Sequence, residues 1–135
     1  MTNVDLAKSY MIKASKRLRI LSVLLDDQAY SDIIREAQEI VELVLKGMLR
    51  HAGIDPPKWH DVSDIIIANK DLFPDEIKAN LNEIASISKW LRKERELSFI
   101  GDIDFIPTEE YTQEDALKAI AGARKLTELA AKCIP

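Results

Sequence analysis

The sequence predicts an all-α protein, an up-and-down antiparallel four-helix bundle with one extra short helix, or about five helices. Three observations favour this class. Apolar residues recur at alternating spacings of three and four over long segments, as they do on the buried stripe of a helix. Only 4 glycines and 5 prolines occur, and most lie between these segments. The composition, 47% hydrophobic and 31% charged, is typical of a folded chain with a core. A single domain over residues 1–135 is therefore expected.

The first two helices are expected over residues 3–27 and 32–52. The first carries one apolar seam, made of Ala7, Met11, Ala14, Leu18, Leu21 and Leu25. The second has a wider apolar stripe, which predicts the most buried helix of the bundle. Ser31 is expected to cap its start. Gly53 is expected just past its end, where a left-handed backbone is needed.

The remaining helices are expected over residues 62–70, over residues 74–98, and from Thr112 to the C-terminus. His60 or Asp61 starts the short one, and Asp115 completes a capping box with Thr112. The apolar seam of the helix over 74–98 reaches Arg95, where the pattern asks for an apolar residue. Arg95 is therefore predicted to point inward.

Charge and cysteine usage narrow the functional classes. The net charge is −4 and the pI about 5.2, so no overall positive field attracts nucleic acid. One cysteine and two histidines predict no disulfide, no transition-metal site and no cofactor. No segment is apolar enough to span a membrane or to serve as a signal peptide, so we expect a cytoplasmic protein without a membrane partner. A basic stretch is interpreted as a solvated face, with RNA or nucleotide contact as the alternative: Lys13, Lys16, Arg17 and Arg19.

Familiar catalytic motifs such as a phosphate-binding glycine loop or HExxH do not occur in the sequence. His60 is interpreted as a packed residue at a helix start, and a contact in a cleft is the alternative. An inward Arg95 needs a carboxylate partner, since an unpaired buried charge is costly. Asp102 or Asp104 in the following loop could serve as this partner. On the second helix, Glu42 stands four residues before Lys46, which is the favourable order for a helical ion pair.

Residues 38–61 resemble the HEPN domain family. The family's second helix commonly has Gln, then Glu, then Leu-Lys, and ends near Gly. A proline-containing turn and a His follow. The matching residues here are Gln38, Glu42, Leu45, Lys46, Gly53, Pro56, Pro57 and His60. Residues 111–130 also resemble the family's last helix.

The resemblance implies an antiparallel bundle that dimerises, often beside a small nucleotidyltransferase, with many members acting as toxins of toxin–antitoxin pairs. Ribonuclease members use an Arg, a polar residue and a His a few residues later. Arg95 and Glu96 match the start of this motif and are the catalytic candidates, but no His follows His60. The resemblance also places Glu42 near Arg95, so Glu42 is the favoured carboxylate partner of Arg95. The ligand-binding candidates are Arg95, Arg92, Glu42, Lys46, His60 and Asp102.

The leading hypothesis is a HEPN-type homodimer that lacks the full ribonuclease motif. It would bind a nucleotide, RNA or a nucleotidyltransferase in a toxin–antitoxin-like system. A metal-independent endoribonuclease toxin that uses Arg95 is the first alternative, and a structural helical adaptor is the second. The homodimer is expected because apolar residues exceed what one bundle interior needs, with Ile87, Trp90 and Phe99 as the predicted outer patch.

Overall fold

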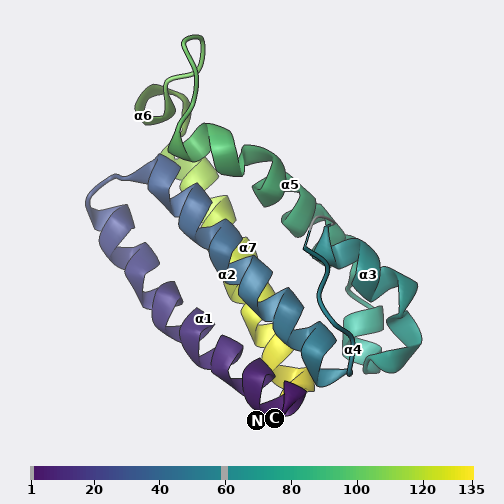
Figure 1. Cartoon of the computed structure of the whole chain (residues 1–135). Helices are drawn as coiled ribbons and strands as arrows, with labels where there is room; N and C mark the ends of the chain where they lie inside the picture. Colours follow the sequence, from purple (N-terminus) through teal and green to yellow (C-terminus); the bar gives the residue numbers. More distant parts are fainter. Residues whose placement is uncertain (1, 59–60) are drawn as a thin grey trace.

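Four long helices alternate in direction and build the protein. The computed structural model describes residues 2–58 and 61–135. The long helices are α1 (Asn3–Asp26), α2 (Tyr30–His51), α5 (Leu81–Phe99) and α7 (Gln113–Cys133). They run alternately up and down, and both termini lie at the same end of the bundle (Figure 1). The predicted all-α antiparallel four-helix fold is confirmed. Among the described helices, none is long and apolar enough to cross a membrane.

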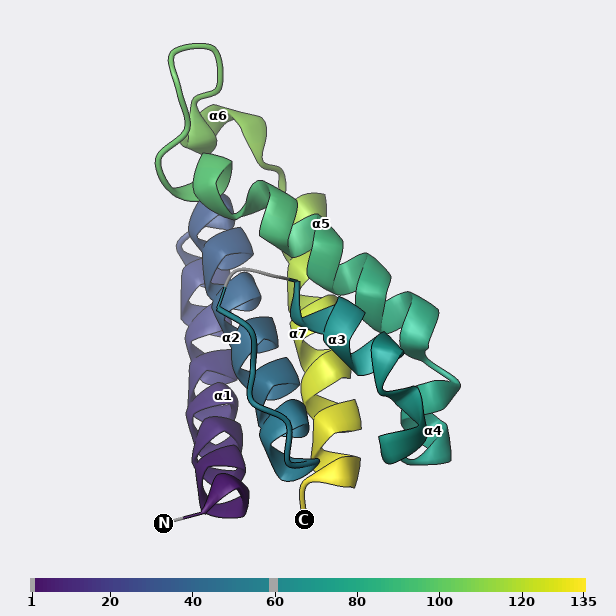
Figure 2. The same ribbon diagram turned by 45° about the vertical axis from the view of Figure 1, so that its right-hand side comes forward.

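Short helical segments complete the chain, and they outnumber the single one predicted. They are α3 (Val62–Ala68), the 3₁₀ turn η1 (Lys70–Leu72), α4 (Asp75–Lys78) and α6 (Pro107–Glu110). Figure 2 shows α3 and α4 beside the first half of α5. The predicted continuous helix over 74–98 is wrong, because the chain leaves helical geometry at Asn80 (φ −115°, ψ 13°). The Asn80 amide donates to the carbonyl of Glu76 at 2.7 Å, a local bond that competes with helix propagation.

Helix α2 lies at the centre of the bundle and packs against α1, α5 and α7. Twelve of its 22 residues are buried, against ten of 21 in α7, four of 19 in α5 and three of 24 in α1, which confirms the prediction that this helix is the most buried. Its largest fully buried side chains are Ile33, Ile34, Ile40, Leu45, Met48 and Leu49. A helix buried to this extent has only a narrow polar stripe, and that stripe carries most of its charged side chains.

Sequence signals at the helix ends agree with the structure in most places. Capping boxes form at Thr2 with Asp5 and at Thr112 with Asp115. Gly53 follows α2 with φ +82°, as expected for a left-handed residue after a helix. The predicted cap at Ser31 is wrong. The chain turns sharply at Gln28 (φ +56°) and re-enters a helix at Tyr30, so Ser31 lies inside the first turn and is buried.

A hairpin-like loop projects beyond the bundle between α5 and α6 (Figures 1 and 2). Two backbone hydrogen bonds of 3.0 and 3.1 Å join Asp102 and Phe105. Gly101 has φ +68°, and a Cβ there would lie 2.3 Å from the carbonyl oxygen of Phe105, so only glycine fits. The loop therefore has a defined shape and holds Asp102 away from the body of the bundle.

Candidate functional site

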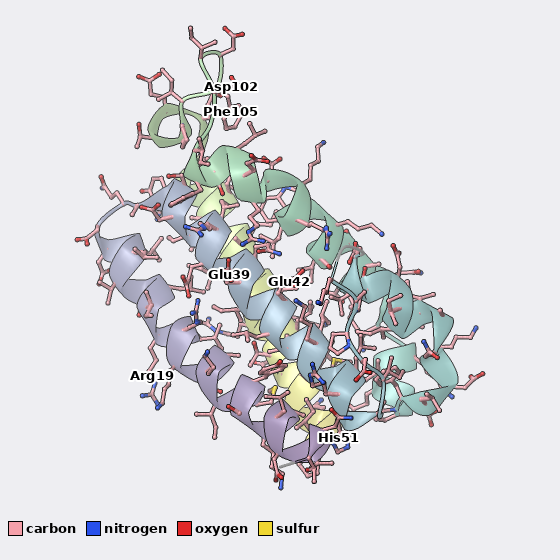
Figure 3. All side chains as sticks on the ribbon, in the orientation of Figure 1. Arg19, Glu39, Glu42, His51, Asp102 and Phe105 are labelled. Atoms are coloured by element: carbon pink, nitrogen blue, oxygen red, sulfur yellow. The ribbon has the colours of Figure 1, made fainter. Side chains whose placement is uncertain are left out.

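The polar stripe of α2 forms one wall of the candidate site. Arg35, Glu39, Glu42 and Lys46 follow one another at intervals of four, three and four residues, which places them on one helix face. All four are half-buried. Figure 3 shows Glu39 and Glu42 on the part of α2 that lies between α1 and α5. This helix face therefore presents charge in a partly enclosed setting.

Helix α5 supplies the opposite wall through ion pairs with this stripe. An Nη2 of Arg95 lies 2.8 Å from an Oε1 of Glu39. Glu42 has two basic neighbours, Lys46 at 3.1 Å and Arg92 at 3.6 Å. Each of these side chains keeps about a quarter to a half of its surface exposed. The pairs orient the guanidinium groups without removing them from water.

A cavity of about 310 Å³ opens between these walls. The loop after α2 contributes Pro57 and Lys58 to it. Its lining holds four basic side chains, two acidic ones, one amide and one proline: Lys46, Lys58, Arg92, Arg95, Glu42, Glu96, Gln38 and Pro57. A positive excess at this place contrasts with the net charge of −4 for the chain. The cavity therefore suits an anionic group.

Comparison with known proteins fixes the family. A family model described as HEPN domain matches residues 7–134. The chain belongs to the HEPN domain family. It is similar to the protein named "Putative toxin MJ1304" of Methanocaldococcus jannaschii. The two are 26% identical over 134 residues, which cover 94% of this chain and 87% of the relative. No solved structure matches the chain.

Arg95 of this HEPN protein lies at the cavity, but not in the way the sequence pattern predicts. Its side chain is 47% exposed, so the predicted inward orientation is wrong. The buried seam of α5 continues from Leu91 to Ser98, seven residues later, and does not include Arg95. Either the third or the fourth residue after Leu91 can continue a helical seam, and here Glu94 takes the more buried place. The predicted partner is also wrong, because Arg95 pairs with Glu39, one turn before Glu42.

The other predicted site residues of the HEPN chain divide into two groups. Arg92, Glu42, Lys46 and Glu96 line the same cavity as Arg95. Asp102 does not, because it lies in the projecting loop, where its side chain accepts a hydrogen bond from the backbone of Asp104 (Figure 3). His60 lies outside the described residues. In the basic stretch of α1, Arg17 pairs with Glu36 at 3.1 Å, while Arg19 points away from the bundle (Figure 3).

An anchor beside the cavity was not foreseen from the sequence. Asp61 caps α3 and accepts hydrogen bonds from Ser63 (2.9 and 2.8 Å), from Ser88 of α5 (3.0 Å) and from Lys89 (3.1 Å). Burial alone would raise the pKa of Asp61, but these hydrogen bonds outweigh burial and lower it. Asp61 thus ties the end of the loop that carries Lys58 to α5. The sequence indicated the cap, whereas the bonds to α5 join residues 27 and 28 positions apart.

The predicted outer patch is only partly exposed. Ile87 packs into the notch at Gly122 of α7, where an added Cβ would lie 2.9 Å from its Cγ2. Trp90 is half-buried, and the ammonium of Lys118 lies 4.0 Å from its ring centre. Phe99 is 54% exposed, and the guanidinium of Arg35 lies 3.6 Å from its ring centre. Of the three, Phe99 alone is more than half exposed.

Proposed function

We propose that this HEPN protein binds the phosphate groups of RNA or of a nucleotide in the cavity between α2 and α5. The observation that carries the proposal is the convergence of four basic side chains, from two helices and a loop, on one cavity. Arginine forks match phosphate oxygens in pairs, and lysine adds a mobile point charge. A phosphate is therefore the anion that this set of donors suits best.

The carboxylates that pair with the arginines of the cavity favour this role. Glu39 and Glu42 hold Arg95 and Arg92 in place before a ligand arrives. Ion pairs that remain partly exposed contribute only about 0.2–1 kcal/mol, so a phosphate can exchange with them at little cost. Preorganised donors lose less side-chain entropy on binding, which strengthens the interaction.

A toxin-like role is supported by the relative that carries the name "Putative toxin MJ1304". Ribonuclease activity has less support. The residues after Arg95 and Glu96 include no histidine, the side chain that moves protons most readily near neutral pH. Glu96 is the remaining candidate for proton transfer at the cavity. Binding without cleavage is therefore the function we propose, and a metal-independent endoribonuclease is the alternative.

Fluorescence anisotropy with a labelled single-stranded oligoribonucleotide tests the proposal. Arg95→Ala removes a charge-assisted contact and should weaken binding at least about tenfold. Lys93→Ala is the matched control, because Lys93 is an exposed cation of the same helix outside the cavity lining. Equal affinities for the wild-type protein and both variants would contradict the proposed site. Cleavage of the oligoribonucleotide that disappears in Arg95→Ala would favour the endoribonuclease.

We also propose a cytoplasmic homodimer that associates through the outer end of α5 and the loop after it. Four large apolar side chains there are 47–93% exposed: Phe99, Ile100, Ile103 and Ile106. Exposed apolar groups gathered in one place are typical of association sites.

The family resemblance supports a small nucleotidyltransferase as the partner. Light scattering tests the dimer and co-purification tests the partner. A monomer that binds neither RNA nor a nucleotide but retains a protein partner would favour the structural adaptor.

A further inference from the structure

One buried side chain at the cavity has no hydrogen-bond partner. Gln38 lies on α2, is 3% exposed and lines the cavity. Within the described residues, its Oε1 is buried without a hydrogen bond. Buried polar side chains are almost always hydrogen-bonded, so an unpartnered amide in the lining of a cavity indicates a contact that a ligand completes once the amide turns toward it.

We infer that Gln38 is a specificity residue of this cavity and accepts a hydrogen bond from a hydroxyl or amino group that the ligand carries beside its phosphate. The inference rests on the proposed function and deepens it. Inorganic phosphate can satisfy the basic side chains, but it carries no sugar or base that could donate a hydrogen bond to Gln38. A nucleoside phosphate satisfies both. The ligand class is therefore a phosphate ester that carries such a donor beside its phosphate, as a nucleoside phosphate does, free or as a unit of RNA.

The position of Gln38 in the helix supports this assignment. Gln38, Glu42 and Lys46 stand at successive steps of four residues and form one row along α2. All three line the cavity. The carboxylate of Glu42 is paired with Lys46 and Arg92, so a neutral amide and a net basic group face the same space along one helix. A nucleotide complements this arrangement, because its phosphate is an anion for the basic groups and its sugar or base carries a neutral donor for the amide.

The other two unpartnered buried atoms found in the described chain differ from Gln38. They are the Nε of Arg50 and the Nδ1 of His51, near the end of α2. Neither residue lines this cavity. Arg50 also has partners for its Nη1, which donates to Asn3 at 3.1 Å and lies 3.7 Å from a carboxylate oxygen of Asp55. The unpartnered amide of Gln38 is thus associated with the cavity and not with the end of α2.

Isothermal titration of Gln38→Met with three probes tests the inference: inorganic phosphate, ribose 5-phosphate and adenosine monophosphate. Methionine keeps the length of glutamine without its polar atoms. We expect the variant to bind adenosine monophosphate about tenfold or more weakly, and to bind inorganic phosphate within about twofold of wild type. An equal loss with ribose 5-phosphate assigns the donor to a sugar hydroxyl. A loss confined to adenosine monophosphate assigns it to the base.

Controls separate this role from a structural one. Thr127→Val also replaces a buried polar side chain with an apolar one, on α7 and away from the cavity lining, and should leave all three affinities unchanged. The melting temperature of Gln38→Met should equal or exceed that of wild type, because an unpartnered buried amide is removed. Unchanged affinity for adenosine monophosphate, or an equal loss for inorganic phosphate, would overturn the inference. Failure of wild-type protein to bind any probe would instead refute the proposed function.

Discussion

Helices α7 and α5 pack on two sides of α2 and bring opposite kinds of side chain to it. Helix α7 brings small buried residues to the bundle, Ala116, Ala119, Ala123 and Ala130 among them. Helix α5 brings Arg92 and Arg95, which reach across to Glu42 and Glu39. Small residues let two helices approach closely, whereas long charged ones keep their ends in water and leave a cavity. This difference agrees with our proposal that the α5 side binds the ligand, and it predicts that the α7 side contributes more to stability.

Truncation in the core on the α7 side should have the largest effect on stability. Leu126 is 1% exposed, so Leu126→Ala should lower the free energy of unfolding by about 2–5 kcal/mol through lost burial and a new cavity. Urea denaturation followed by circular dichroism measures this. Leu117→Ala, at a residue of the same helix that is 48% exposed, is the control. A loss below about 1 kcal/mol for Leu126→Ala would contradict the division of roles.

Removal of the cap of α7 should have a smaller effect. The Thr112 hydroxyl accepts from the backbone of Asp115 at 3.2 Å, and the Asp115 carboxylate accepts from the backbone of Thr112 at 3.0 Å. Thr112→Ala leaves the helix start without this side-chain acceptor and should cost about 0.5–2 kcal/mol. The same denaturation experiment checks it. Thr108→Ala, in α6, is a threonine control without a capping bond in the structure. Equal losses in the two variants would show that the cap contributes nothing.

The anchor on the α5 side should make stability depend on acid. The pKa of Asp61 is lower in the folded chain than its ordinary value of 3.8. Its contribution is therefore complete above pH 3.8 and is lost as the pH falls through the folded value. At pH 7 the free energy of unfolding of Asp61→Asn should be about 0.5–1.5 kcal/mol lower than that of wild type. On acidification from pH 7 to pH 3 it should then fall by less than that of wild type. Unfolding curves at both pH values measure this. Asp64→Asn, the exposed second partner of Lys89, is the control.

Truncation of Arg95 should have the smallest effect on stability. Its pair with Glu39 is 47% and 32% exposed, so Arg95→Ala should cost no more than about 1 kcal/mol. A loss of 3 kcal/mol or more would instead show a structural ion pair and move Arg95 to the stabilising side of the comparison. Double-mutant analysis with Glu39→Ala isolates the pair energy from other effects.

The fold could be predicted because its signals are local and repeated. Apolar seams, capping boxes at Thr2 and Thr112, and Gly53 each depend on residues within a few positions of one another. The break at Asn80 could not be predicted in this way, because a side chain that bonds to a carbonyl four residues back does not alter the hydrophobic period.

The candidate site was predictable as a set of residues but not as a geometry. Helical spacing and the family resemblance identified five of the residues that line the cavity, while Pro57, Lys58 and Gln38 were missed as lining residues. The partner of Arg95 was placed one turn away from its observed position, because helical spacing does not fix how α5 slides along α2. Gln38 is one of the residues that carry the family resemblance, but its burial and its unpartnered Oε1 depend on how three segments pack together.

A nuclear magnetic resonance titration tests most directly whether the cavity between α2 and α5 is the phosphate site. Side-chain signals of arginine and glutamine would be followed as adenosine monophosphate is added to the full chain. Our account predicts saturable shifts for Arg92, Arg95 and Gln38, while Arg17 and Arg19 of α1 stay unchanged. Shifts confined to Arg17 and Arg19 would place the ligand on the basic stretch of α1 and contradict the account.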